Sequence, residues 1–372
     1  MKKNKHYRVF TDFHHASLLQ SFILLFEKRL GGQVYRPIGR EWFDQGFWKV
    51  YDHPATVEQY LSIGGATPDG TAKLNEVLTT GEDFDGISTI YNCQDIDSGQ
   101  TNKAITFDGF MSSHFDIVIA SIPAHIEPFK RLCELHPDHP KFIFQIGNSW
   151  TVDAGLSPNI MASALIDNVP ADIHFITYHQ EFDLMLFHPR TNINGRWNKH
   201  NFDVMPENNV YSFINCFDSA GHFAQDWQLF TQVEAAMPDY KYKVYGGQCR
   251  DGSANGATEV AKKMREAMFI WHTKFGGDGY GHVIHNAPAV GKPLIVKKQY
   301  YSGKIAEPLL IDGETCLTID GLDCTQVINK IRHFSNPDLY IPMSKAAYSK
   351  FREVVNFNVE ADKLADFLLC LK

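Results

Sequence analysis

Four glycines fall within six residues, at Gly276, Gly277, Gly279 and Gly281, and a short apolar segment follows them. A break at 291–293 then leads into the apolar run 294–296. This order predicts a loop, a helix, a tight turn and a buried strand. A glycine-rich loop that opens a helix leaves backbone N–H groups free and lets a ligand approach closely, which favours phosphate. We therefore expect a nucleotide-linked substrate to bind here.

Several cations and histidines lie close to this loop in the sequence. Lys274 precedes it, and Arg250 follows an earlier predicted strand, so either could neutralise a phosphate; the simpler interpretations are a solvated lysine and a turn residue. His282 and His285 lie three apart, on one helical face. They could contact a sugar hydroxyl or phosphate, or be hydrogen-bonded structural histidines. No carboxylate follows at a spacing useful for zinc, so we expect no metal site.

A second group of polar residues follows the first predicted strand of the chain. Asp12, His14 and His15 come directly after it, at the carboxyl end, where open α/β sheets bind ligands. One of them could orient or deprotonate an acceptor. The alternative is that Asp12 helps to cap the helix that follows. His125 also follows a predicted strand, but loop polarity explains it more simply.

The elements that must position these residues alternate between strand and helix along most of the chain. This alternation indicates α/β architecture with parallel sheets. Strands are expected at 7–11, 33–36, 115–122, 141–146 and 173–178, then at 210–217, 240–245, 268–272, 294–296 and 315–319. Helices are expected at 16–30, 124–135, 223–236, 257–267 and 324–334, with one after the glycines.

We expect two Rossmann-like domains that face a cleft. The first covers residues 1–190 and contains an irregular insertion at 41–106, and the second covers 209–342. The polar segment 187–209 has no periodicity and is interpreted as a linker. Residues 343–372 are expected to be mostly helical and to pack back across both domains.

The insertion is rich in aromatic residues, and Trp42 and Trp48 are the candidates for acceptor binding. Aromatic rings could cradle a flipped base by stacking. The favoured alternative is an ordinary hydrophobic subdomain.

Composition limits the class of protein. The chain has 372 residues, a formal charge of −8 and seven cysteines without CxxC spacing. The charge argues against gripping long nucleic acid by electrostatics alone. The cysteines indicate a reducing compartment. With no signal-peptide pattern and no run long enough for a membrane span, we expect a cytoplasmic protein. The oligomeric state stays open.

The glycine-rich segment resembles that of retaining GT-B glycosyltransferases, which pair two Rossmann-like domains and bind a nucleotide-sugar in the carboxyl half. The matching residues are Asp278, Gly279, Tyr280, Gly281, Ala287, Gly291 and Pro293. Two positions depart from the pattern: Asn286 stands where the family has a second carboxylate, and Pro288 should kink or end the helix.

The resemblance implies roles for the matched positions. Backbone amides from Gly277 to Gly281 would contact the diphosphate or the sugar, Asp278 would hold sugar hydroxyls, and Asn286 would lie near the ribose. Many relatives neutralise the diphosphate with an Arg and a Lys after the first strand of the second domain. Residues 213–222 contain neither, so this charge must come from elsewhere.

The function that this resemblance implies is sugar transfer from a nucleoside-diphosphate sugar to a hydroxyl acceptor, retaining and without a metal or other cofactor. The acceptor is open: a saccharide, a small molecule or a modified DNA base. Three alternatives remain. They are a phage-type enzyme that modifies hydroxymethylated pyrimidines in DNA, a non-hydrolysing nucleotide-sugar epimerase, and a catalytically silent protein that binds sugar nucleotides.

Overall fold

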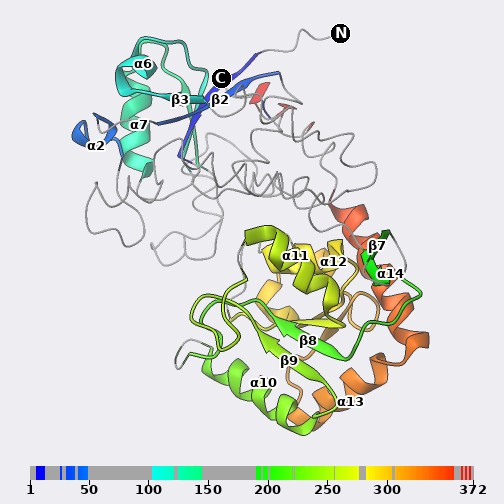
Figure 1. Ribbon diagram of the computed structural model, residues 1–372. Coiled ribbons are helices and arrows are strands. Elements are labelled where there is room, and N and C mark those ends of the chain that lie inside the picture. The colour runs from blue at the N-terminus through cyan, green and yellow to red at the C-terminus, as the bar shows by residue number, and fades with distance from the viewer. Residues whose placement is uncertain are drawn as a thin grey trace. The chain divides into compact units, whose positions relative to one another are not determined.

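A computed structural model divides the chain into two compact units (Figure 1). Unit 1 comprises Met1–Phe182 and Phe357–Lys372, and unit 2 comprises Asp183–Asn356. The structure describes residues 6–12, 26, 31–37, 41–48, 103–120, 125–144, 190–193, 196–199, 202–219, 221, 223–254, 256–275, 282–303, 306–355, 362, 365–366 and 368–369.

Unit 1 is built on a five-stranded parallel sheet with the strand order β3-β2-β1-β4-β5. The strands are β1 (Arg8–Thr11), β2 (Gln33–Pro37), β3 (Lys103–Ile105), β4 (Ile117–Ala120) and β5 (Lys141–Phe144). The helices are α2 (Glu41–Asp44), α6 (Phe107–Met111) and α7 (Ile126–Leu135). All four residues of β4 are buried apolar side chains, as expected for a central strand of a parallel sheet, which is covered on both faces.

Unit 2 holds a second five-stranded parallel sheet, with the order β12-β11-β10-β8-β9. Its strands are β8 (Asn209–Ser212), β9 (Lys241–Val244), β10 (Phe269–His272), β11 (Leu294–Val296) and β12 (Cys316–Thr318). Its helices are α10 (Ala224–Ala236), α11 (Gly256–Glu266), α12 (His282–Ala289), α13 (Cys324–Phe334) and α14 (Pro337–Val354), with 3-10 turns η5 (Lys298–Tyr301) and η6 (Glu307–Leu309). Helices α11 and α12 lie on one face of the sheet, and α10 and α13 on the other (Figure 1).

Local chemistry explains where several helices begin and end. Asp323 and Gln326 form a reciprocal capping box that starts α13. Pro288 lies in the last turn of α12, which ends at the next residue, in keeping with the missing proline N–H. The following turn needs glycine, because Gly291 has a φ of +69° and the Phe202 ring occupies the place where a Cβ would lie.

Strands occur in two segments that were expected to be irregular. Residues 190–199 were interpreted as part of a linker, but β6 (Arg190–Ile193) and β7 (Arg196–Lys199) pair as an antiparallel hairpin. At the end of the expected insertion 41–106, Lys103–Ile105 form β3, which pairs with β2 at the edge of the sheet of unit 1. Residues 49–102 lie outside the described residues. The expected helix at 16–30 and strand at 173–178 lie almost wholly outside the described residues.

The carboxyl-terminal helix starts earlier than expected. α14 begins at Pro337, capped by the Asn336 side chain, and runs to Val354 within unit 2. Residues from Phe357 onward group with unit 1. In the part of the chain that the structure describes, no helix is both long and apolar enough to cross a membrane.

Candidate functional site

In unit 2 the strand order reverses between two neighbouring strands, β8 and β10. From β8 the chain continues to β9 on one side, and from β10 it continues to β11 on the other. Open α/β sheets bind ligands outside the carboxyl ends of the strands at such a switch point. β10 ends at His272 and α12 starts at His282, so the glycine-rich segment connects the two at this edge. Gly277, Asp278, Gly279, Tyr280 and Gly281 themselves lie outside the described residues.

Two segments of unit 2 bring side chains together at this edge, in what we call the Tyr300 cluster: α10 supplies Asp226, and the segment that follows β11 supplies Lys297 and Tyr300. The Lys297 Nζ lies 2.6 Å from the Asp226 Oδ1, and the Tyr300 hydroxyl donates to the Asp226 Oδ2 at 3.1 Å. Phe275, 54% exposed, meets the Tyr300 ring edge-to-face with centroids 5.6 Å apart. The cluster therefore contacts Phe275, the last described residue before Gly276.

The Tyr300 cluster holds its lysine in the charged form. Burial alone would lower the pKa of Lys297, but the hydrogen bond and ion pair with Asp226 outweigh it and raise that pKa above its ordinary value. Sequence reasoning did not single out Lys297. The signal for it was its position directly after the apolar run 294–296, at the carboxyl end of a predicted strand.

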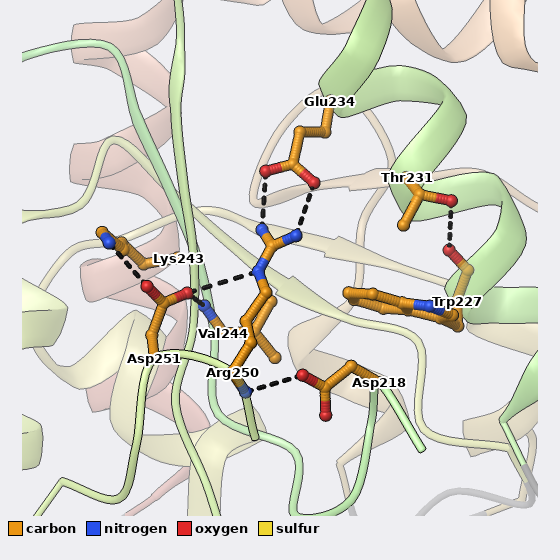
Figure 2. A network of polar contacts seen from close by, with 8 residues as sticks. All are labelled: Asp218, Trp227, Thr231, Glu234, Lys243, Val244, Arg250 and Asp251. Carbon is orange, nitrogen blue, oxygen red and sulfur yellow. Dashed lines mark hydrogen bonds and ion pairs between the residues drawn. The ribbon is translucent and has the colours of Figure 1, made fainter. Parts of the chain in front are cut away.

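Arg250 is engaged in a polar network beyond β9 (Figure 2). Its guanidinium donates to both oxygens of Glu234, at 2.9 and 2.6 Å, and its Nε donates to Asp251 at 3.4 Å. The hydrogen bond to Glu234 raises the pKa of Arg250. Two carboxylates thus already neutralise this cation, so a contact between Arg250 and a donor phosphate would have to compete with them.

The other predicted donor residues lie on either side of the glycine-rich segment. Lys274 follows β10 by two residues and is half-buried, and His282, also half-buried, is the first residue of α12. Asn286, on the same helix, is only 3% exposed, and no described group donates a hydrogen bond to its Oδ1. A buried acceptor of this kind calls for a donor from water, ligand or chain.

In unit 1, Asp12 and His125 form a buried pair. The sheet of unit 1 reverses its order between β1 and β4, and Asp12 directly follows β1 while His125 precedes α7. The His125 Nδ1 lies 2.8 Å from the Asp12 Oδ2, with both side chains fully buried. Trp48 packs on the His125 ring at 4.6 Å, and Phe129 stacks on it at 5.1 Å. Asp12 therefore contacts His125 rather than solvent. His14 and His15 lie outside the described residues.

We expect Asp12→Ala to lower the free energy of unfolding by about 1–3 kcal/mol, because it removes the carboxylate acceptor of a buried imidazole N–H. Urea denaturation measures this loss. Asp138→Ala is the matched control, since Asp138 bonds to the exposed His114 at 3.0 Å and its removal should change stability by less than about 0.5 kcal/mol. An Asp12→Ala protein as stable as the wild type would refute a structural role for the pair.

The burial of Trp42 and Trp48 corrects the acceptor role expected for them and agrees with the favoured alternative, an ordinary hydrophobic subdomain. Trp42 has 0% exposure, stacks on Phe10 at 4.6 Å and donates from Nε1 to the Ile105 carbonyl at 3.1 Å. Trp48 is buried against His125. Rings enclosed in this way have no face on which a base could stack, so both residues belong to the hydrophobic core of unit 1.

Within the described ranges, no three His, Cys, Asp or Glu side chains gather in a group that could hold a metal ion.

Solved structures of glycosyltransferases share the fold of this chain. A glycosyltransferase from Rickettsia africae aligns with a TM-score of 0.53 and 11% identity over 99% of this chain and 100% of its own. HepE from Anabaena, solved with UDP-glucose, gives 0.52 and 13% over 99% and 100%. Sucrose-phosphate synthase from Thermosynechococcus elongatus gives 0.52 and 10% over 99% of both chains. These neighbours are GT-B glycosyltransferases, and the likeness establishes the expected α/β fold.

The sequence itself matches no protein-family model and no curated protein sequence.

Proposed function

We propose that this protein transfers a sugar from a nucleoside-diphosphate sugar to an acceptor hydroxyl. The observation that carries the proposal is the place of the glycine-rich segment, which joins β10 to α12 at the strand-order switch of unit 2. A diphosphate at this edge would meet backbone N–H groups at the start of a helix, where negative charge is stabilised. The fold shared with glycosyltransferases over the whole chain supports the same assignment.

The chemistry needs two things from the protein. Negative charge develops on the leaving diphosphate and must be stabilised, and the acceptor hydroxyl must be held near the anomeric carbon. We assign the first task to unit 2. We propose that Asp278 holds the sugar hydroxyls and that His15 contacts the acceptor, with Asp12 acting through His125 as a positioning residue. We further propose that the transfer retains the configuration of the anomeric carbon and needs no metal ion.

A panel of nucleotides and nucleotide-sugars tests the proposal. A ligand that binds only the folded chain raises its melting temperature, and at one hundred times its Kd it adds about 2.7 kcal/mol to stability. We expect a nucleoside diphosphate and its sugar to raise the melting temperature by several degrees. Release of the nucleoside diphosphate in the presence of an acceptor distinguishes a transferase from a silent binding protein. The anomeric configuration of the product then reports retention or inversion.

We expect Asn286→Ala to weaken binding of UDP by about three- to ten-fold and to leave inorganic pyrophosphate binding unchanged. The reason is that the Asn286 Oδ1, buried and without a described donor, is available to a ribose hydroxyl, whose hydrogen bond is worth about 0.5–1.5 kcal/mol. Calorimetric titration of both ligands measures the two affinities. Equal weakening of UDP and pyrophosphate would refute the ribose contact.

A further inference from the structure

We propose that Lys297 is the cation that binds the diphosphate, in place of the Arg and Lys that residues 213–222 lack. The inference rests on the proposed function for the identity of the ligand, although the anion site can be tested by itself. Asp226 and Tyr300 would fix the lysine.

The position of Lys297 follows from the sheet register. β10 and β11 pair in parallel, with His272 opposite Val296, so Lys297 and Thr273 leave the sheet side by side. Two residues beyond Thr273, Phe275 contacts the Tyr300 ring. Phe275 therefore joins the segment that follows β10 to the cluster around the lysine. Both lie at the edge where a parallel sheet of this order binds its ligands.

The geometry of the Tyr300 cluster leaves Lys297 able to bind a further acceptor. An ammonium group has three N–H donors. Asp226 accepts one at 2.6 Å, and the Tyr300 hydroxyl lies 3.5 Å from the Nζ, at the limit for a second. Neither contact uses the third N–H, and 16% of the lysine side chain stays exposed. An anion could reach that donor without breaking the ion pair.

The buried carboxylate of Asp226 explains why the lysine points in a fixed direction. Asp226 is buried in the first turn of α10, where the helix dipole favours a negative charge. The Tyr300 hydroxyl donates to its second oxygen at 3.1 Å, so both carboxylate oxygens are engaged. A flexible lysine loses side-chain entropy when it binds a ligand. The ion pair incurs that loss during folding, which leaves the ammonium preorganised.

Lys297→Met tests the assignment by titration of the full chain with inorganic pyrophosphate and with UDP. We expect both ligands to bind at least about ten-fold more weakly, the effect of losing one charge-assisted hydrogen bond. Lys297→Arg keeps the positive charge and should retain most of the affinity. It keeps the assignment testable if Lys297→Met does not fold. Melting temperatures of the free proteins show which variants are folded.

Lys330→Met is the matched control. Lys330 is 19% exposed, and its Nζ lies 2.7 Å from the Asp312 Oδ1, so it resembles Lys297 in burial and pairing. It lies on α13 and also donates to the Thr318 carbonyl at 2.9 Å. We expect Lys330→Met to leave pyrophosphate binding unchanged. Lys297→Met should lower the melting temperature more, because it leaves the buried Asp226 carboxylate without its cation, whereas 48% of the Asp312 side chain is exposed.

Asp226→Asn separates an anion site from a purely structural ion pair. The amide oxygen can still accept from Lys297, while the competing negative charge is gone, so pyrophosphate affinity should be retained or rise.

Equal loss of affinity in Lys297→Met and Lys330→Met would overturn the assignment, as would unchanged affinity in Lys297→Met. If the wild type binds UDP and Lys297→Met binds it equally well, only the lysine assignment fails. If the wild type binds pyrophosphate but turns over no sugar nucleotide, the proposed function fails and the anion site stands. Binding of neither ligand refutes both.

Discussion

Trp42→Ala is expected to lower the free energy of unfolding of unit 1 by about 3–5 kcal/mol, the cost of truncating a large aromatic side chain in a packed core. Trp42 has no exposed surface and packs on Phe10, Phe107 and Phe110. Its removal would also leave the Ile105 carbonyl without the indole donor, in the strand that completes the sheet. Hydrogen exchange of amides in β1 and β4 reports the stability of unit 1.

Two further variants separate the packing of the Trp42 ring from its hydrogen bond and from the general effect of removing an apolar side chain. Trp42→Phe keeps a ring against Phe10 but removes the hydrogen bond to Ile105, so we expect a smaller loss of about 1–2 kcal/mol. Leu135→Ala removes a large apolar side chain that is mostly exposed at the end of α7, and should change stability by less than about 0.5 kcal/mol. If Trp42→Ala left stability intact and abolished sugar transfer, Trp42 would be an acceptor residue after all.

Trp42 also illustrates why the sequence left two interpretations open, an acceptor-binding surface and an ordinary hydrophobic subdomain. Pattern reasoning sees an aromatic residue in an irregular stretch and cannot tell a binding surface from a core. Trp42 is covered by Phe10, Phe107 and Phe110 and donates to the Ile105 carbonyl of β3, a strand of three residues, and all of these lie far from it along the chain. Non-local pairing of such a short strand has no periodic signal. The elements that repeat apolar residues over their full length, such as β11 and α13, were predicted with the bounds that the structure has.

The hairpin formed by β6 and β7 was missed for a different reason. The segment is polar, so its strands lack the alternating apolar pattern by which half-buried strands are recognised. Asn194-Gly195 between the strands is a strong hairpin signal that was present in the sequence. Polar strands joined by a turn of this type can therefore be found from the turn rather than from the strands.

The candidate site was predictable in its location but not in its chemistry. A glycine-rich stretch after a buried strand identifies the edge of the sheet, because glycine content and strand hydrophobicity are both local properties. The pairing of Lys297 with Asp226 joins residues 71 positions apart, and only the parallel register of three strands brings them together. The same holds for Asp12 and His125, which are separated by 113 positions. Sequence reasoning could name Arg250 as a cation but could not see that Glu234 already neutralises it.

Lys292→Met is expected to raise the free energy of unfolding of unit 2 at pH 7, by about 2–3 kcal/mol. Burial, reinforced by the nearby Arg265, lowers the pKa of Lys292 from 10.5 to about 7. No carboxylate among the described residues forms an ion pair with it. Each unit of pKa difference corresponds to about 1.4 kcal/mol, so the difference of about 3.5 between the two pKa values sets a ceiling of about 5 kcal/mol. The residue keeps 9% of its surface in solvent, so we expect less than the ceiling.

The effect of Lys292 on the free energy of unfolding depends on pH. Between pH 7 and 10.5 the unfolded chain keeps the Lys292 proton and the folded chain has released it. Because the unfolded state then binds more protons, this lysine makes stability rise with pH through that window. Below about pH 7 both states are protonated and the full penalty of burying the charge applies. Methionine has no such penalty, so the stabilisation by Lys292→Met should be greatest at pH 7 and below and should vanish near pH 10.5.

Urea denaturation of the wild type and Lys292→Met at several pH values between 6 and 10 tests this expectation, with hydrogen exchange of β10 amides to assign the effect to unit 2. The matched control is Lys263→Met on the neighbouring α11. Lys263 forms an ion pair with Glu259 at 3.3 Å. Burial alone would lower the pKa of Lys263, but the hydrogen bond and ion pair with Glu259 raise it above its ordinary value. Its replacement should therefore leave stability unchanged or slightly reduced. A Lys292→Met protein less stable than the wild type at pH 7 would mean that the ammonium has a partner worth more than its desolvation, and that the turn before β11 is itself built around a charge.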